Sequence, residues 1–287
     1  MSVPEDNKLY SIGEAGKICH VSAKTLRYYD QIGVVRPDVV SEENGYRYYS
    51  YKTLLRIPII KYYKQLGFKL EEMSHLLNGE SYRGVDLNFR EKIDELAQIE
   101  QDAHRKYLAV HDWYELLHEA TVVSAAPFQE VSVRYIPARE LVWMEQPFHY
   151  DYHRAIVNIP WTDYLDSVHC AITDAVILEF ASFRDKMAGR AKTMRIMQRV
   201  AGRLDGNARH VTIGGTLACC LYHIGPHETL NESYARIMAW ADSHGYSCGE
   251  KSWERYVIDY WTTGLAEEMV TELIVPVTAV RAGEAQE

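Results

Sequence analysis

The apolar positions of the first thirty residues recur with the period of two short helices. Ser11 stands three positions before Glu14, which is a capping box, so a helix is predicted to start directly after Ser11. A second helix is predicted from Ser22, which can cap it, to Tyr29. Two short helices joined by a few residues predict a helix-turn-helix motif.

The second of these helices has two faces of different character. Leu26 and Tyr29 share one face and are expected to pack inward. Lys24, Arg27 and Tyr28 stand at i, i+3 and i+4 and share another face. Arginine and tyrosine side chains both suit phosphate oxygens, so this outer face is predicted to bind an acceptor-rich surface. The alternative is an ordinary solvated helix face.

The segment after the second helix predicts a β-hairpin. The pair Asn44-Gly45 lies between two short β-prone runs, and both residues tolerate the positive φ of a tight turn. On the return strand, Arg47 and Tyr49 lie on one face and Tyr48 lies on the other.

Further helices are predicted over residues 51–66 and 70–77. Pro58 lies inside the first of them, where it removes a backbone hydrogen bond and is expected to kink the helix. Gly67 is expected to end that helix.

Residues 87–119 contain no proline or glycine and carry an apolar heptad seam. Its positions, at alternating steps of four and three, are Phe89, Ile93, Leu96, Glu100, Ala103, Tyr107, Val110, Tyr114 and Leu117. A solitary helix of this length gains little stability from propensity alone, so it is expected to pair. The partner is either a second copy or the chain's own remainder. Because no second heptad segment is present, we expect a homodimer through residues 85–119.

Beyond residue 120 the pattern becomes a mixture of strands and helices. Period-two alternation predicts strands over residues 131–136, 140–146, 252–261 and 269–277, and a pair of strands over residues 210–225. Residues 230–245 predict an amphipathic helix. The order strand–helix–strand–strand resembles a second copy of a unit that begins near Val131. Between His169 and Arg203 the pattern is ambiguous and predicts no element.

Charge is distributed unevenly along the chain. The net charge of −9 disfavours non-specific binding of nucleic acid, but residues 8–69 hold eleven basic and five acidic side chains and so carry +6. The remainder therefore carries −15, which suggests one module facing an anion and another facing something neutral or cationic. The chain has neither a run of about 18 apolar residues nor a signal pattern, so a cytoplasmic protein without membrane contact is expected.

The stretch YSIGEAGKICHVSAKTLRYYDQIGVVRP, the NGYRYY that follows, and the Gly67-Phe68 break resemble the N-terminal domain of MerR-family transcription regulators. The long heptad segment is similar to the antiparallel dimerisation helix of that family. Residues 212–277 resemble the effector domain shared by its multidrug-binding subclass and by gyrase-inhibitor-like proteins.

The resemblance implies a mixed fold, α plus α/β, in three parts. We expect a winged helix-turn-helix over residues 1–80 and a dimerisation coiled-coil helix over residues 81–120. An α+β effector domain with a duplicated strand–helix–strand–strand unit is expected over residues 121–287.

The resemblance also implies a function, that of a ligand-responsive activator which binds promoter DNA as a dimer and distorts it. Its expected partners are double-stranded promoter DNA, RNA polymerase and a small-molecule effector. The residues implied at the DNA are Ser11, Lys24, Thr25, Arg27, Tyr28, Arg47, Tyr48 and Lys61. Phosphate contacts of this kind give affinity and register, while few base contacts specify sequence.

An effector pocket for an organic cation needs aromatic faces and a desolvated carboxylate. In SWERYVIDYW, residues 252–261, alternation puts Glu254 on one face with Tyr256 and Tyr260. The drug-binding subclass keeps an acidic residue at the position of Glu254. Trp143 and Glu145 form a similar pair in the first copy. The predicted ligand-binding residues are Trp143, Glu145, Tyr222, Glu254, Tyr256 and Tyr260. For any single aromatic residue the alternative is a core position.

Two other function classes stay open. Some stand-alone gyrase-inhibitor-like domains resemble small-molecule hydrolases, in which Glu254 would act as a general base. A ligand-sequestering protein would instead bind its ligand without any effect on DNA. The sequence offers no nucleophile–histidine–acid order, so no catalytic residue is predicted and an enzyme is not expected. Five cysteines without a CxxC pair, and none near the end of the long helix, predict no metal site, and no cofactor is expected.

Overall fold

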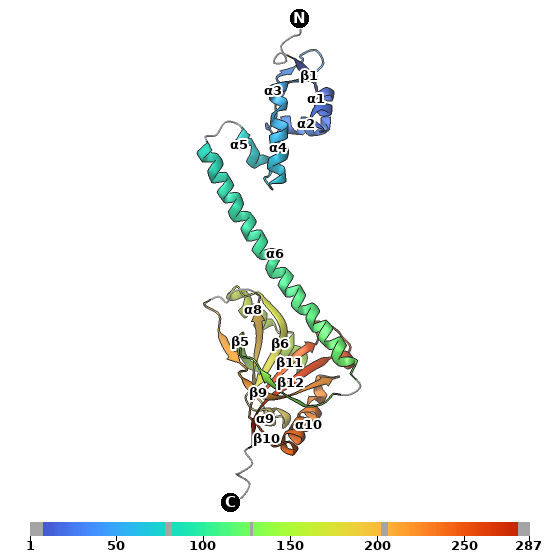
Figure 1. Ribbon diagram of the computed structural model, residues 1–287, viewed down its shortest axis with the longest axis vertical. Helices are drawn as coiled ribbons and strands as arrows, with labels where there is room; N and C mark the ends of the chain where they lie inside the picture. The colour runs from blue at the N-terminus through green and yellow to red at the C-terminus, as the bar shows by residue number, and fades with distance from the viewer. Residues whose placement is uncertain (1–7, 78–81, 127–128, 202–205, 281–287) are drawn as a thin grey trace, which may run out of the picture. The chain divides into compact units, whose positions relative to one another are not determined.

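The computed structural model describes residues 8–77, 82–126, 129–201 and 206–280 and divides into two compact units, residues 1–100 and 101–287 (Figure 1). The expected domain boundary at residues 80 and 81 lies outside the described residues. One continuous helix, α6 (Tyr82–Ser124), contributes its first part to one unit and its last part to the other. Among the described helices, none has both the length and the apolar character that crossing a bilayer requires.

The first unit begins with the predicted pair of short helices. α1 (Ile12–Cys19) starts after Ser11, whose hydroxyl accepts from the Glu14 amide while the Glu14 carboxylate accepts from the Ser11 amide. The capping box is therefore confirmed. α2 (Ala23–Gln31) is capped by Ser22, whose hydroxyl accepts from the Thr25 amide at 3.0 Å.

A three-stranded sheet carries the predicted hairpin. β2 (Val39–Val40) and β1 (Leu9–Ser11) pair antiparallel with the two edges of β3 (Arg47–Ser50). Gly45 has a φ of 69°, and the Asn44 side chain accepts from the Tyr46 amide at 3.0 Å. The predicted hairpin is present, but only Gly45 of the pair takes a positive φ, while Asn44 contributes its side-chain hydrogen bond.

The prediction of one kinked helix over residues 51–66 is wrong. The segment instead forms two helices, α3 (Tyr51–Leu54) and α4 (Arg56–Gln65), which break at Leu55. Pro58 consequently lies in the first turn of α4, where an amide has no intrahelical acceptor, so its missing N–H costs no hydrogen bond. Gly67, with a φ of 86°, follows the end of α4 as predicted.

The core of the first unit joins the helices to the small sheet. Its fully buried side chains include Ala15, Leu26, Tyr29, Tyr49, Leu54, Ile57, Ile60 and Met73. The final short helix, α5 (Leu70–Leu77), has the Glu72 carboxylate accepting from the Lys69 amide at 2.8 Å. Phe89, near the start of α6, packs against this core and against Phe68.

One antiparallel sheet forms the centre of the second unit, with strand order β4-β9-β12-β11-β6-β7-β5-β8 and β10 paired to β12. Its strands are β4 (Ser132–Ile136), β5 (Arg139–Pro147), β6 (Ile172–Phe180), β7 (Thr193–Val200), β8 (His210–Ile213), β9 (Thr216–Ile224), β10 (Tyr246–Cys248), β11 (Ser252–Ile258) and β12 (Val270–Ala279). The helices are α7 (Tyr152–Ile156), α8 (Ile159–Ser167), α9 (Phe183–Met187) and α10 (Leu230–Ser243), with single turns η2 (His227–Thr229) and η3 (Ala266–Glu268).

The predicted duplication of this unit is present in the sheet, but the strand–helix–strand–strand order of the first copy begins at Arg139 rather than near Val131. The first copy runs β5, then α7 and α8, then β6 and β7, and the second runs β9, α10, β11 and β12. The strand before each copy, β4 or β8, pairs with the first strand of the other copy. The region that predicted no element, residues 169–203, contains β6, α9 and β7.

The two faces of the large sheet differ in what covers them. The larger apolar cluster lies on the face that packs against α7, α8, α9 and α10. The opposite face carries a smaller cluster around Trp253 and, near the end of α6, another around Leu116 and Val257. Cys219 and Cys220 belong to opposite faces, as alternation predicts, and all five cysteines are free.

The β4–β5 connection and the β8–β9 connection contact each other at Gly214. The Gly215 amide donates to the Ile136 carbonyl at 2.8 Å, which joins the β8–β9 turn to the end of β4. A Cβ on Gly214 would lie 2.3 Å from the Pro137 carbonyl oxygen, and the φ of Gly214 is 86°. Only glycine fits this contact between the two copies.

Gly214→Ala is expected to destabilise the second unit by about 3 kcal/mol or more, because the left-handed backbone cost adds to a steric clash. Gly245→Ala is the matched control, since Gly245 also has a positive φ (73°) but its added Cβ would meet open space. We expect the control to cost about 1 kcal/mol. Urea unfolding followed by tryptophan fluorescence measures both, because all six tryptophans lie between residues 113 and 261. Equal costs for the two variants would contradict the predicted clash.

Candidate functional site

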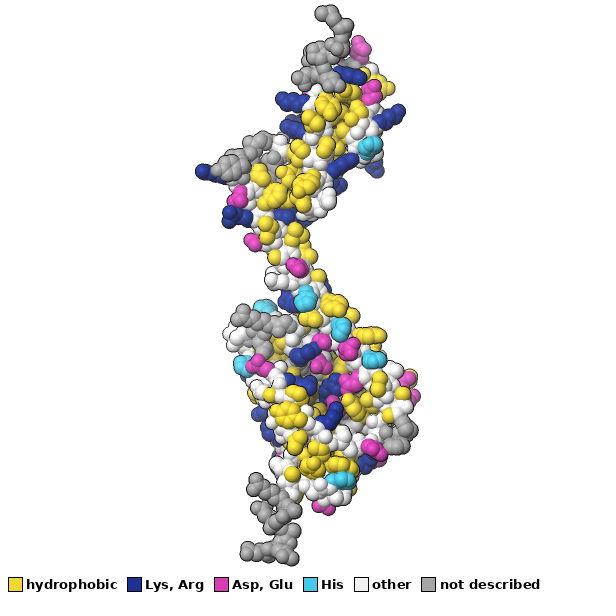
Figure 2. Space-filling view, in the orientation of Figure 1, with side chains coloured by type: hydrophobic (Ala, Val, Ile, Leu, Met, Phe, Trp, Pro, Cys, Tyr) yellow, Lys and Arg dark blue, Asp and Glu magenta, His cyan; other side chains and the backbone are white. Residues whose placement is uncertain are grey.

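The outer face of α2 is exposed, and its inner face is buried. Leu26 and Tyr29 are core side chains, whereas Lys24, Arg27 and Tyr28 are exposed. The predicted division of this helix into two faces is therefore confirmed. Figure 2 shows lysine and arginine side chains over the surface of the first unit.

In the hairpin, the two faces of β3 have different roles. Tyr49 is fully buried and Tyr48 is half-buried. The Arg47 Nε donates to the Asp30 carboxylate at the end of α2, at 2.8 Å. Arg47 thus fastens the hairpin to α2 with one edge of its guanidinium.

Three further residues predicted at DNA use their polar atoms inside the unit. Ser11 caps α1, and the Thr25 hydroxyl lies 2.8 Å from the Ser22 hydroxyl. The Lys61 ammonium donates to the Cys19 carbonyl at 2.6 Å, and the His20 carbonyl lies 3.4 Å away. Lys61 therefore satisfies carbonyls that the end of α1 leaves without partners.

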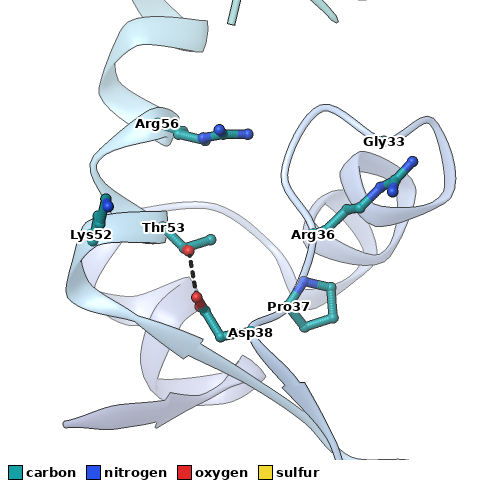
Figure 3. A pocket seen from close by; sticks show the side chains of 7 residues that line it. All are labelled: Gly33, Arg36, Pro37, Asp38, Lys52, Thr53 and Arg56. Atoms are coloured by element: carbon teal, nitrogen blue, oxygen red, sulfur yellow. Dashed lines mark hydrogen bonds between the residues drawn. The ribbon is translucent and has the colours of Figure 1, made fainter. Parts of the chain in front are cut away.

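Sequence reasoning missed a basic groove between the loop after α2 and the start of α4. The groove encloses about 550 Å³, and Arg36, Lys52 and Arg56 line it (Figure 3). The Asp38 carboxylate in the same groove accepts from the Ser50 amide at 2.6 Å and from the Thr53 hydroxyl at 3.0 Å. Burial alone would raise the pKa of Asp38, but these hydrogen bonds outweigh it and hold the pKa below its ordinary value. The groove therefore keeps a net positive charge.

The heptad seam of α6 is largely exposed within the chain. The exposed fractions of Ile93, Val110 and Tyr114 are 62 %, 71 % and 63 %. Such a row of apolar side chains along one helix is typical of a surface that another helix covers.

On the helix-covered face of the large sheet, Glu254 is completely buried, with 0 % of its surface exposed. Its carboxylate accepts from the Tyr234 hydroxyl at 2.9 Å and from the Tyr256 hydroxyl at 2.6 Å. The Lys186 ammonium lies 2.9 Å from the same carboxylate and is 1 % exposed. Burial, and then the charge of Glu254, raise the pKa of both tyrosines well above the ordinary value.

Aromatic rings surround this charged pair. The Lys186 ammonium lies 4.8 Å from the Tyr234 ring centroid, 5.5 Å from that of Tyr152 and 5.8 Å from that of Phe180. Separations below about 6 Å are those of cation–π contacts. We call Glu254, Lys186, Tyr152, Phe180, Tyr234 and Tyr256 the cage.

His227 adjoins the cage and stays neutral. Its ring lies 4.9 Å from that of Tyr256 and 5.3 Å from that of Tyr260. Burial lowers the pKa of His227 to about 4. Neither ring nitrogen has a hydrogen-bond partner among the described residues.

Of the predicted ligand-binding residues, the structure brings Glu254, Tyr256 and Tyr260 together and separates the other three from them. Trp143 lies on the opposite face of the sheet, under the Arg195 guanidinium at 4.5 Å, and the exposed Glu145 lies 3.8 Å from the same guanidinium. Tyr222 also lies on that face, because its strand turns Leu221 rather than Tyr222 toward the helices. Alternation fixes which residues share a face but not which face the helices cover.

The cage residues that sequence reasoning missed include Lys186, Tyr152, Phe180 and Tyr234. Lys186 and Phe180 fall in the segment whose pattern predicted no element. Tyr234 is on the predicted helix α10, where its place on the apolar face was the available signal.

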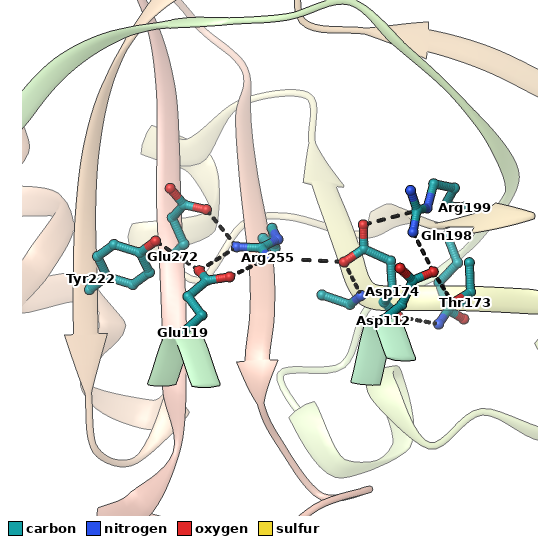
Figure 4. Close-up of polar contacts among 10 residues, drawn as sticks. Asp112, Glu119, Thr173, Asp174, Gln198, Arg199, Tyr222, Arg255 and Glu272 are labelled. Atoms are coloured by element: carbon teal, nitrogen blue, oxygen red, sulfur yellow. Dashed lines mark hydrogen bonds and ion pairs between the residues drawn. The ribbon is translucent and has the colours of Figure 1, made fainter. Parts of the chain in front are cut away.

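Tyr222 is one of four polar residues that link the sheet to the end of α6, and we call these residues the clasp: Glu119, Tyr222, Arg255 and Glu272 (Figure 4). Arg255 donates to both Glu119 carboxylate oxygens, at 2.6 and 2.7 Å, and to Glu272 at 3.0 Å. The Tyr222 hydroxyl donates to Glu119 at 2.8 Å. Burial alone would raise the pKa of Glu119, but the hydrogen bonds and charge of Arg255 outweigh it and lower the pKa.

A second set of contacts holds α6 two turns earlier. The Asp112 carboxylate accepts from the Thr173 hydroxyl at 2.6 Å and from the Arg199 guanidinium (Figure 4). Hydrogen bonds and ion pairs of Asp112 and Glu119 thus fix the last part of α6 to β6, β7, β9 and β11.

An apolar cavity of about 310 Å³ lies beside these contacts. Its lining includes Trp113 of α6, Trp161 of α8 and Trp261, with the carboxylate of Asp166 and no lysine or arginine. The size and lining are those of a small-molecule site, but none of the cage residues lines it.

The loop that carries Tyr260 and Trp261 is anchored by Asp259. This carboxylate is 5 % exposed and accepts from the Trp261 amide at 2.9 Å. Burial raises the pKa of Asp259 to about 6.

Two family models match the chain. The model described as MerR HTH family regulatory protein matches residues 10–80, and the model described as GyrI-like small molecule binding domain matches residues 129–278. The chain is 25 % identical to the multidrug-efflux transporter 2 regulator of Bacillus subtilis, over 95 % of this chain and 98 % of that protein. It is 40 % identical to the multidrug-efflux transporter 1 regulator of the same organism, over 32 % of this chain and 35 % of that protein.

Solved structures with a similar chain include a DNA complex and a hydrolase. EcmrR, in the cryo-EM structure of its DNA complex in EcmrR-RPo, is 23 % identical with a TM-score of 0.45, over 94 % of this chain and all of that one. A hydrolase from Listeria innocua is 14 % identical with a TM-score of 0.39, over 56 % of this chain and 98 % of that one. The two Bacillus relatives are named as regulators and not as enzymes.

Asp259→Asn is expected to change the pH dependence of stability, because asparagine keeps the acceptor for the Trp261 amide but does not titrate. The folded-state pKa of about 6 lies above the ordinary 3.8. The stability that Asp259 contributes is therefore fully present below pH 3.8 and is lost as the pH rises through 6. Between about pH 4 and pH 7, the variant should gain stability relative to the wild type by on the order of 3 kcal/mol.

Urea unfolding followed by tryptophan fluorescence at several pH values measures this difference. Asp163→Asn, the same change at an exposed carboxylate of α8, is the control. A constant difference between Asp259→Asn and the wild type would contradict the prediction.

Proposed function

The chain belongs to the GyrI-like small molecule binding domain family and carries a MerR HTH domain, and from this premise we propose that it is a ligand-responsive activator of transcription. In this proposal it binds double-stranded promoter DNA as a dimer, acts on RNA polymerase through distortion of the promoter, and takes a small aromatic cation as effector. The observation that carries the proposal is the buried, tyrosine-bonded carboxylate of Glu254, in a unit that shares one continuous helix with a basic first unit.

We assign the DNA contacts to the exposed face of α2 and to the basic groove. Lys24, Arg27 and Tyr28 have exposed side chains on α2, which suits the major groove. Arg36, Lys52 and Arg56 supply further charge for the phosphates beside it. Ser11, Thr25, Arg47 and Lys61 are positioning residues in this proposal, since their polar atoms already hold α1, α2 and the hairpin. Tyr48 is proposed to touch the DNA backbone.

A homodimer through residues 85–119 is supported by the exposed apolar seam of α6. A helix of 43 residues with such a seam buries it when it pairs with a second copy. Two copies would also double the phosphate contacts, as a long promoter site requires.

We further propose that β11 carries the effector signal to α6. Glu254 and Arg255 are neighbours on this strand and point to opposite faces, Glu254 into the cage and Arg255 into the clasp with Glu119. If effector binding shifts β11, Arg255 moves with the strand and carries the shift to Glu119 of α6. Coupling of this kind is a difference in effector affinity between two states of the protein.

Binding without turnover is favoured over hydrolysis. As a general base, Glu254 would need a water molecule and a free acceptor site. Its carboxylate instead has no exposure, accepts from two tyrosines and faces an ammonium group. Mass spectrometry of recovered ligand tests this point, and a converted product would support the hydrolase.

Arg27→Ala and Val110→Glu are expected to weaken promoter binding for different reasons. Arg27→Ala removes a phosphate or base contact from each copy and should lower affinity at least about tenfold while leaving a dimer. Val110→Glu puts a charge into the seam and should give a monomer with a larger loss of affinity. Fluorescence anisotropy with the chain's own upstream promoter fragment and analytical ultracentrifugation measure the two effects.

Controls separate these effects from a general change of charge. Lys251→Ala removes a positive charge from the second unit, and Gln101→Glu adds a negative charge to α6 off the seam. Neither should alter affinity more than about twofold. A monomeric wild type that ignores the fragment at low salt would defeat the proposal.

Glu119→Gln is expected to uncouple the effector from DNA. In the wild type, promoter DNA should change the Kd for an organic cation such as tetraphenylphosphonium by about 5- to 150-fold. The variant should bind the cation alone with a similar Kd but lose most of this change. Glu115→Gln, an exposed change one turn earlier on α6, is the control. Full coupling in Glu119→Gln would rule out the clasp as the route.

A further inference from the structure

Lys186 is a buried cation that occupies the cage from within the chain. Its side chain is 1 % exposed, and its ammonium faces Glu254 at 2.9 Å and three aromatic rings at 4.8 to 5.8 Å. A carboxylate with aromatic faces is the surrounding that an organic cation seeks in a protein. The chain thus supplies its own cation to the site that the proposed function gives to the effector.

The hydrogen bonding of the Lys186 ammonium is incomplete. The distance to Glu254 is that of a hydrogen bond, but the alignment is not, and the Lys186 ammonium has no hydrogen-bond acceptor among the described residues. The attraction between the two charges does not depend on alignment, so the ion pair remains. A buried pair repays its desolvation only when its donors are also hydrogen-bonded, and this one leaves them unmet.

We infer that Lys186 is a built-in substitute for the effector, which an organic cation displaces from Glu254. The inference rests on the proposed position and cationic class of the effector and adds the competitor. The class is a monovalent cation with an apolar or aromatic body, because such a molecule replaces both the ammonium and the hydrocarbon stem of the lysine.

The exchange of one cation for another keeps Glu254 compensated throughout. The carboxylate never has to face an apolar surrounding without a counter-charge. The released ammonium returns to water, where it regains its hydration. A neutral or anionic compound cannot drive the exchange, since displacement of Lys186 would leave Glu254 without a counter-charge.

The element that carries Lys186 is small. α9 has five residues, is capped by the Ser182 hydroxyl, and is followed by Gly189 with a φ of 72°. Phe183 holds it to α10 by stacking on Tyr234, and the Lys186 carbonyl accepts from the Tyr150 hydroxyl at 3.1 Å. Rotation of the long lysine side chain, or a shift of this one helix, suffices to empty the cage.

Amine labelling of the full-length wild type tests the displacement directly. Without added cation, Lys186 should resist an amine-reactive reagent because it is buried, while the exposed Lys251 is labelled. Saturating tetraphenylphosphonium should raise the labelling rate of Lys186 at least tenfold and leave that of Lys251 unchanged. Mass spectrometry of peptides reads both sites. A bound cation that leaves Lys186 protected overturns the inference.

Lys186→Met tests the competition. The variant should bind tetraphenylphosphonium at least tenfold more tightly than the wild type, and the cation should raise its Tm by more than that of the wild type. Lys251→Met is the matched control and should bind like the wild type. The double variant Lys186→Met, Glu254→Gln should lose the gain, because the charge that attracts the cation is gone.

The outcomes separate this inference from the proposed function. Equal affinity of wild type and Lys186→Met, with both weakened by Glu254→Gln, keeps the effector site and overturns the role of Lys186. If Glu254→Gln leaves the affinity for the cation unchanged, the cation binds at another site, such as the Trp113 cavity, and the inference is overturned. No binding of the cation by any variant also overturns it, while promoter binding continues to test the regulator. If Lys186→Met does not fold, the labelling of the wild type decides alone.

Discussion

The carboxylate of Glu254 has no access to water, and much of the second unit serves to keep that charge stable. An isolated ionised group cannot remain charged in an apolar interior, so it needs hydrogen-bond donors and a counter-charge. Tyr234 and Tyr256 supply the donors, from α10 and from β11 itself. Lys186 supplies the charge from α9, a short helix inserted between two strands of the first copy. The cage therefore joins the two copies of the duplicated unit around a single residue.

β11 carries this constraint through the sheet because successive side chains of a strand point to opposite faces. Glu254 is compensated on the helix-covered face, and Arg255 is compensated on the other face by Glu119, Glu272 and Asp174. Glu254 is buried and Arg255 is half-buried, and each has a charged partner on another element, so neither can shift without disturbing a partner. This arrangement gives one strand a mechanical connection to α6 that apolar packing alone would not provide.

In the first unit, the basic side chains fall into two groups, those that pair with acceptors inside the unit and those that stay exposed. Arg47 and Lys61 satisfy Asp30 and the carbonyls at the end of α1, which fixes the hairpin and the two short helices. Lys24 and Arg27 remain exposed on α2, and Arg36, Lys52 and Arg56 line a groove whose one carboxylate is occupied by Ser50 and Thr53. A count of basic residues in the sequence includes all of these side chains. It cannot tell those that bond within the unit from those that stay available to DNA, because this depends on which acceptors the fold brings within reach.

The sequence by itself determined the features that depend on neighbours in the chain. These include the capping box of α1, the Ser22 cap and two faces of α2, the hairpin around Asn44-Gly45, the long helix with its seam, the duplicated unit, and the shared face of Glu254 and Tyr256. Periodicity and capping act over a few residues, so they can be read locally. The break at Leu55 was missed because the helical period continues through it.

Only the tertiary structure decided which strand faces meet the helices and which charges meet each other. Tyr222 and Trp143 obey the predicted alternation but point away from the cage, because the sheet order sets which face is covered. Lys186 meets Glu254 from 68 positions away in the chain, out of a segment without a clear pattern. Pairing over such a distance follows from strand order and register, which no local period records.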